Sequence, residues 1–94
     1  MRENRNSEKW LEKEADRRVR QMGGKSEKWG TMSNPDRIFF LPDNIIFFIE
    51  FKSYEQTPTP AQKYKIKEML GFGVRTYVVA SLNDLNGIPE LKNY

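Results

Sequence analysis

Hydrophobic residues are concentrated in one stretch of the chain, where two apolar runs are separated by a short polar segment. The runs, 37–41 and 45–52, are rich in aromatic and β-branched residues, which favour β-strands. Pro42, Asp43 and Asn44 lie between them and are residues that preset φ or tolerate left-handed backbone. This pattern predicts a β-hairpin.

The turn also fixes the pairing of the two strands. If the turn is centred on Asp43, residues equally distant from it face each other, and Asp36 lies opposite Glu50. Directly opposed residues hold their Cβ atoms about 4.5–5.5 Å apart. Because side chains alternate along a strand, Glu50 and Lys52 share a face and Phe51 points to the other.

Two carboxylates and a lysine therefore meet at the open end of the hairpin. Opposed like charges destabilise a strand pair, so Asp36 and Glu50 indicate a cation between them. Mg²⁺ takes oxygen ligands and is typically held by one or two carboxylates with waters and substrate phosphates. A lysine beside it suits metal-assisted phosphodiester cleavage. The structural alternative is a salt bridge from Lys52 to either carboxylate at a sheet edge.

Other segments complete a pattern of helices and strands. Ser7 caps a helix that ends at about Met22, before Gly23-Gly24. Thr59-Pro60-Ala61-Gln62 is a capping-box start in which Gln62 is the N3 partner. The remaining expected elements are an edge strand at 25–29, the body of the second helix to about Leu70 with Ile66, Met69 and Leu70 packing, a strand at 74–80, a short helix from Ser81 to about Leu85, and an unassigned tail at 86–94.

These elements predict one domain over residues 1–94, with a polar, frayed segment at 1–6. Their order, α-β-β-β-α-β, predicts an α/β fold with a mixed sheet. The second hairpin strand is apolar on both faces, as in a central strand covered on both sides by helices or by a partner. Gly71-Phe72-Gly73 follows a helix rather than a strand, so we interpret it as a helix stop and not as a phosphate-binding loop.

Composition narrows the chemistry. The sequence has no cysteine and no histidine, which excludes histidine-based nucleases and thiolate or imidazole zinc sites. Its net charge is +3, with nine Lys or Arg against six Asp or Glu in 1–28, four against one in 60–75, and two against four in 29–59. Basic segments flanking an acidic centre suit a polyanion held around a metal, although solvated helix faces give the same pattern. No apolar signal or membrane-spanning run is present, and we expect a cytoplasmic protein.

The first helix offers one more carboxylate. Glu12 lies beside its apolar stripe and could reach inward, whereas Glu8, Glu14 and Asp16 are expected further round the helix.

Taken together, these motifs resemble the VRR-NUC family of the PD-(D/E)xK superfamily, which has the restriction-endonuclease-like core. The resemblance covers about residues 8–85 and rests on Glu12, Gly23-Gly24, Lys28, Ser33-Asn34-Pro35-Asp36-Arg37, Glu50-Phe51-Lys52, Thr59-Pro60-Ala61-Gln62 and Gly73–Val79. One departure is Ser33, which replaces the family's usual Gly before Pro-Asp and would alter the shape of that loop.

The resemblance implies roles for these residues. Asp36, Glu50 and the Phe51 backbone carbonyl would ligate Mg²⁺ or Mn²⁺. Lys52 would position or activate the attacking water. Gln62 would be an active-site residue, and Glu12 an outer metal ligand, with Glu14 as the alternative two residues away.

Three functions follow as hypotheses. The first is a metal-dependent DNA endonuclease, selective for branched, flap or four-way (Holliday) junction DNA. It would act as a homodimer in a bacterial or phage-infected cell, like the small stand-alone phage members of the family. A dimer would suit the many large apolar side chains of this short chain, unless they all fit within one core; they include Trp29, Phe39, Phe40, Phe47 and Phe48. The alternatives are a non-cleaving DNA-binding module on the same fold and a structural subunit that binds a protein.

Overall fold

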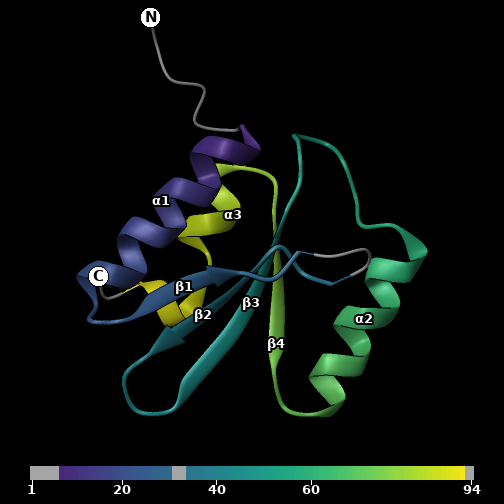
Figure 1. Cartoon of the computed structure of the whole chain (residues 1–94). Helices are drawn as coiled ribbons and strands as arrows, with labels where there is room; N and C mark the ends of the chain where they lie inside the picture. Colours follow the sequence, from purple (N-terminus) through teal and green to yellow (C-terminus); the bar gives the residue numbers. More distant parts are fainter. Residues whose placement is uncertain (1–6, 31–33, 93–94) are drawn as a thin grey trace, which may run out of the picture.

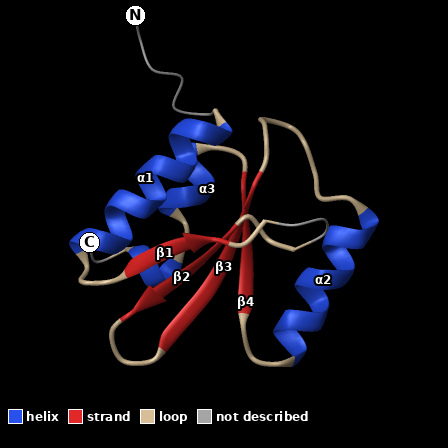
Figure 2. Cartoon of the chain, in the orientation of Figure 1, coloured by secondary structure: helices blue, strands red, loops and turns tan. Residues whose placement is uncertain are grey.

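A computed structural model describes residues 7–30 and 34–92 of the chain. Residues 1–6, 93–94 and Ser33, for which fraying, an unassigned tail and an altered loop are expected, lie outside this description. The elements follow the predicted order (Figures 1 and 2). They are α1 (Glu8–Gln21), β1 (Lys25–Lys28), β2 (Arg37–Leu41), β3 (Ile45–Phe51), α2 (Pro60–Gly71), β4 (Arg75–Val79), α3 (Leu82–Asn86) and a 3-10 helix, η1 (Pro89–Leu91).

The four strands form one mixed sheet in the order β1-β2-β3-β4. The first three strands are antiparallel and β4 runs parallel to β3. The hairpin register is the predicted one, with Arg37 opposite Ile49 and Leu41 opposite Ile45. Asp43 and Asn44 have φ of 69° and 66°, a left-handed backbone that Asp and Asn tolerate better than most residues. The predicted β-hairpin and mixed sheet are confirmed.

The hydrophobic core lies on one face of the sheet. Leu11, Ala15 and Val19 of α1 are fully buried against Phe39 and Phe47 of the hairpin. The α1 and α3 helices lie on this side (Figure 1). The tail that the sequence left unassigned joins the same core through Ile88 and Leu91, beside Leu85 of α3. Each such fully buried side chain contributes about 1.5–3 kcal/mol.

The opposite face is covered less completely. Among the strands, α2 packs mainly against β4 (Figure 2) and has no buried residue. The expectation that Ile66, Met69 and Leu70 pack is wrong for Leu70, whose exposure is 56%. Ile66 and Met69 are half-buried, whereas Leu70, near the end of the helix, faces solvent. On the same face, Trp29 stacks on Phe48 with ring centroids 4.7 Å apart.

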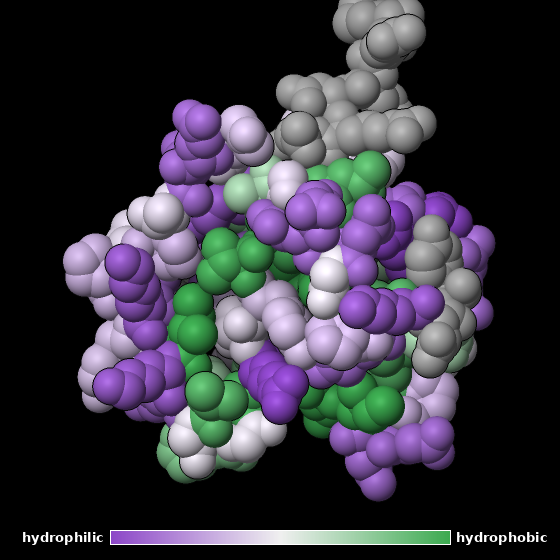
Figure 3. Space-filling view, turned by 180° about the vertical axis from the view of Figure 1, so that it is seen from behind, coloured by the Kyte–Doolittle hydropathy of each residue, from purple (hydrophilic) through white to green (hydrophobic). Residues whose placement is uncertain are grey.

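Most of the large apolar load fits inside one chain. Phe39 and Phe47 are fully buried and Phe48 is 2% exposed, so these residues do not by themselves require a dimer. The large hydrophobic residues that remain exposed include Trp29, Ile46, Tyr64, Leu70 and Phe72. Seen from behind, hydrophobic residues reach the surface around the turn from α2 to β4 and near the hairpin tip (Figure 3). No helix among the described residues is long and apolar enough to cross a membrane.

Glycines end the two long helices as predicted. Gly23, after α1, has φ of +86°, which L side chains rarely adopt. Gly24 packs so closely on β2 that a Cβ there would collide with the Phe40 carbonyl oxygen. This contact sets where α1 ends relative to the sheet.

Candidate active site

The open end of the hairpin brings the predicted carboxylates together. Asp36 immediately precedes β2, and its Oδ2 accepts a hydrogen bond of 2.7 Å from the backbone N–H of Phe51 at the end of β3. Asp36 and Glu50 line one cavity of about 270 Å³. The other lining residues are Glu8, Glu12, Phe51, Lys52 and Gln62.

Glu50 is buried, with an exposure of 3%. Its Oε2 accepts a hydrogen bond of 2.8 Å from Gln62 Nε2 and lies 3.3 Å from Lys52 Nζ. Its Oε1 is buried and has no hydrogen-bond partner among the described residues. A buried carboxylate oxygen without a partner is costly, and it indicates a ligand that the protein itself does not supply.

The pKa shifts of Asp36 and Glu50 also favour a positively charged ligand at this site. Burial raises the pKa of Glu50, the charge of Asp36 raises it further, and Lys52 opposes both effects. Burial likewise raises the pKa of Asp36, and the charge of Glu12 raises it further, while the hydrogen bond from the Phe51 N–H lowers it. Both carboxylates are therefore disfavoured in their charged forms, which a bound cation would reverse.

The residues present fit a hard divalent cation. No group of three or more Asp or Glu side chains within residues 7–30 and 34–92 is arranged to hold a metal unaided. Mg²⁺ does not require one, because it is commonly held by one or two carboxylates, with waters and substrate phosphates completing the shell. Asp36 and Glu50 supply the carboxylates, and the neighbouring Phe51 carbonyl is the further candidate ligand.

Strand alternation explains how β3 serves both core and site. The Phe51 side chain is 3% exposed and belongs to the core, whereas Lys52 Nζ lies 3.3 Å from Glu50 Oε2 at the cavity. The Lys52 N–H donates to the Val79 carbonyl at 2.9 Å, so its backbone is fixed next to β4. The predicted shared face of Glu50 and Lys52 is confirmed.

Gln62 completes the predicted capping box and also contacts Glu50. Its Oε1 accepts a hydrogen bond from the Thr59 N–H at 2.9 Å, while its own N–H donates to Thr59 Oγ1, which completes the predicted capping box. Its Nε2 donates to Glu50. The start of α2 is thereby tied to the cavity.

The structure distinguishes Glu12 from Glu14. Glu12 lines the cavity, whereas Glu14 accepts hydrogen bonds from Arg17 and Arg18 at 2.7–2.8 Å. The Arg17 hydrogen bond is the main cause that lowers the pKa of Glu14 to about 2. Glu8 was expected further round the helix but also lines the cavity, since it lies one turn before Glu12 on the same face.

One group of side chains was not foreseen. Arg37 donates to Glu12 Oε1 at 2.9 Å and to Ser26 Oγ at 3.0 Å, and it lies 4.0 Å from Asp16. Arg37 directly follows Asp36, so strand alternation places its side chain on the face opposite to that of Asp36. This alternation was the sequence signal that could have indicated a separate role for Arg37. Its partners come from α1 and β1, so only the fold reveals them.

The mixed four-stranded sheet and the order of its elements are those predicted for the restriction-endonuclease-like core. No family model matches the sequence. A curated protein, "Putative nuclease p44" of Acyrthosiphon pisum secondary endosymbiont phage 1, is 33% identical over 86 residues, which cover 88% of this chain and 91% of that protein. A solved "VRR_NUC domain" matches with a TM-score of 0.80 and 27% identity, over 93% of this chain and 97% of that one.

The chain therefore belongs to the VRR-NUC family of nucleases.

Proposed function

We propose that this protein is a Mg²⁺- or Mn²⁺-dependent DNA endonuclease. The observation that carries the proposal is the buried Glu50 carboxylate, which lies beside Asp36 and has one oxygen with no hydrogen-bond partner in the part of the chain that the structure describes. Asp36, Glu50 and the Phe51 carbonyl would hold the cation, with Glu12 as an outer ligand. When bound, the cation would polarise the phosphate and lower the pKa of a coordinated water.

The chain's own residues would then orient the reaction. Lys52 Nζ, 3.3 Å from Glu50, would position the attacking water and offset the negative charge that develops on the phosphate. Gln62 Nε2 would fix the orientation of the Glu50 carboxylate through its 2.8 Å hydrogen bond.

Positive charge beside the site supports DNA as the substrate. A second cavity of about 240 Å³ shares Glu12 with the first, and four basic side chains outnumber its two carboxylates; the other lining residues are Lys9, Lys13, Asp16, Lys28 and Arg37. Lysines around a metal site favour the approach of a phosphate backbone. The same feature would serve a DNA-binding module that does not cleave, which is the alternative function.

The homodimer and the preference for branched DNA are further parts of the proposal. Tyr64, Leu70 and Phe72, on and just after α2, are exposed by 69%, 56% and 79%, and they offer an apolar surface for a second copy. A dimer would present two active sites and could cut two strands of a junction. Light scattering of the wild type and of Phe72→Lys tests this; a monomeric wild type would contradict it.

The decisive test of cleavage uses labelled linear duplex, single-stranded, flap and four-way-junction DNA with Mg²⁺, Mn²⁺ or EDTA. We expect metal-dependent cutting by the wild type and none by Asp36→Ala or Lys52→Ala. Lys25→Ala is the matched control, because Lys25 is exposed, pairs with Glu27 and lines neither cavity. Normal cutting by either site variant would contradict the assignment. Binding without cutting by the wild type would favour the DNA-binding module.

A further inference from the structure

Arg37 joins three elements at the edge of the candidate active site. From the start of β2, its guanidinium donates to Glu12 of α1 at 2.9 Å and to Ser26 of β1 at 3.0 Å. Ser26 in turn donates to Asp16 at 2.5 Å. Ser26 is 4% exposed and the Arg37 side chain 15%, whereas the Glu12 and Asp16 side chains are each 26% exposed, so the centre of this network is withdrawn from water and its carboxylates reach the surface.

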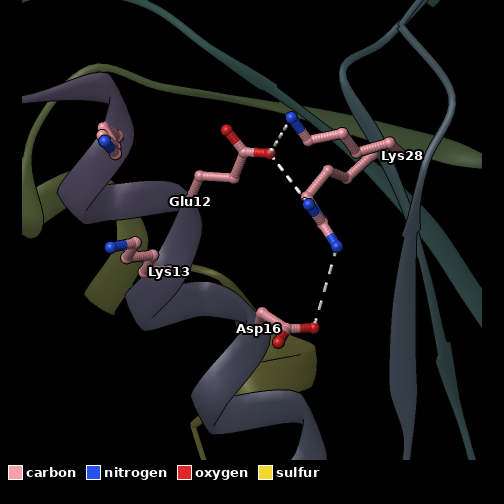
Figure 4. A pocket seen from close by; sticks show the side chains of 6 residues that line it. Glu12, Lys13, Asp16 and Lys28 are labelled. Carbon is pink, nitrogen blue, oxygen red and sulfur yellow. Dashed lines mark hydrogen bonds and ion pairs between the residues drawn. The ribbon is translucent and has the colours of Figure 1, made fainter.

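Glu12 is the residue through which the network reaches the site. It lines both the cavity with Asp36 and Glu50 and the neighbouring lysine-rich cavity. Its Oε1 is held by Arg37, with Lys28 4.0 Å away. Figure 4 shows this oxygen facing Lys28, with the other carboxylate oxygen turned away from it. One oxygen is thus committed to the network.

We propose that Arg37 is a positioning residue that holds Glu12 at the rim of the metal cavity. The inference rests on the proposed function and deepens it. A glutamate side chain has several rotatable bonds, whereas a guanidinium presents its donors in a rigid fork. Arg37, itself fixed by Ser26, therefore keeps Glu12 in the orientation in which its charge acts on the cation. Groups that orient metal ligands in this way typically change metal affinity about 10–100-fold when removed.

The competing explanation is that Arg37 only docks α1 onto the sheet. Both explanations predict some loss of stability in Arg37→Ala, so stability alone does not separate them. Metal affinity does, because a docking contact has no specific effect on a cation held by Asp36 and Glu50. Arg20→Ala is the matched control, since Arg20 bonds the same Asp16 at 2.8 Å but is 59% exposed and does not contact Glu12.

The experiment is titration of the DNA-free protein with Mn²⁺ by calorimetry, alongside thermal unfolding without metal. We expect Arg37→Ala to weaken Mn²⁺ binding about 10–100-fold and Arg20→Ala to leave it unchanged. Arg37→Lys, which keeps a charge near Glu12 but cannot bond Ser26 in the same way, should fall between them. It also tests the proposal if Arg37→Ala fails to fold.

A double-mutant cycle with Glu12→Ala identifies the route of the effect. If Arg37 acts through Glu12, the Arg37 change should not weaken Mn²⁺ binding further once Glu12 is absent. Unchanged Mn²⁺ affinity in folded Arg37 variants, or additive losses in the cycle, would overturn the proposal while leaving the nuclease assignment in place. A wild type that binds no Mn²⁺ would overturn both.

Discussion

Replacing Glu50 by Gln should make the metal-free protein more stable while removing its cleavage activity. Glu50 is 3% exposed, and its Oε1 has no hydrogen-bond partner among the described residues. Glutamine has nearly the same shape. Its amide oxygen can accept the hydrogen bonds from Gln62 and Lys52, and its neutral NH₂ group replaces a buried charged oxygen that has no hydrogen-bond partner among the described residues.

The size of the effect follows from the cost of the unpaired oxygen. A buried polar group without a hydrogen bond costs about 1–3 kcal/mol, and removal of the like charge beside Asp36 adds in the same direction. In a domain of this size, about 1 kcal/mol moves the melting temperature by about 4–8 °C. The expected rise in the free energy of unfolding is therefore easily measured by thermal or urea denaturation.

The stability difference between the wild type and Glu50→Gln should depend on pH. The pKa of Glu50 is raised above its ordinary value of 4.5 by burial and then by Asp36. Below pH 4.5 the side chain is neutral in both folded and unfolded states, so wild type and variant should differ little. As the pH rises through the raised pKa, the folded wild type must ionise a disfavoured group and loses stability relative to the variant.

Glu14→Gln is a control for which the expected change in the free energy of unfolding has the opposite sign. Because the hydrogen bond from Arg17 and the other contacts of Glu14 lower its pKa from 4.5 to about 2, Glu14 stabilises the fold at neutral pH. That contribution should be lost as the pH falls from 4.5 towards 2. If Glu50→Gln proves less stable than wild type at neutral pH, or if its effect does not vary with pH, the reasoning about the buried carboxylate is refuted.

Three further predictions concern the same framework. Saturating Mn²⁺ should raise the melting temperature of the wild type but not of Glu50→Gln in differential scanning fluorimetry; equal shifts would mean that the cation binds elsewhere. Gln62→Glu keeps a capping-box residue but puts a carboxylate against Glu50, so it should lose more cleavage activity than stability. Gln62→Ala should also lose about 1 kcal/mol of stability by urea denaturation. If the two variants lose the same activity and the same stability, the dual role of Gln62 is refuted. Gly24→Ala should destabilise by about 1–3 kcal/mol because its Cβ meets the Phe40 carbonyl, while Gly71→Ala, where the space is open, should not; equal melting temperatures would contradict this.

The hairpin shows how much of the site the sequence determines. A turn centred on Asp43 and strict alternation were enough to predict the register of β2 and β3 and the shared face of Glu50 and Lys52. Capping and stop residues predicted α1 and the start of α2 equally well. These features are local, so local chemistry specifies them.

What the sequence did not predict depends on contacts between distant segments. The 3-10 helix η1 is too short for a periodic pattern, although its last residue, Leu91, and its N-cap, Ile88, are buried in the core. The network of Arg37 requires α1, β1 and β2 to converge. The expected packing of Leu70 failed because helical spacing indicates a face but not whether another surface covers it.

The shallow packing of α2 has a consequence for the motion of the site. Asp36 and Glu50 belong to the hairpin, whose backbone hydrogen bonds should open only when the whole domain unfolds, whereas α2 buries no residue and should open at a much lower free energy. Amide hydrogen exchange should therefore be fast along α2 and slow along β3. Each opening of α2 would withdraw Gln62 and expose Glu50 to solvent, which gives a buried carboxylate a route to exchange protons and ions without loss of the fold.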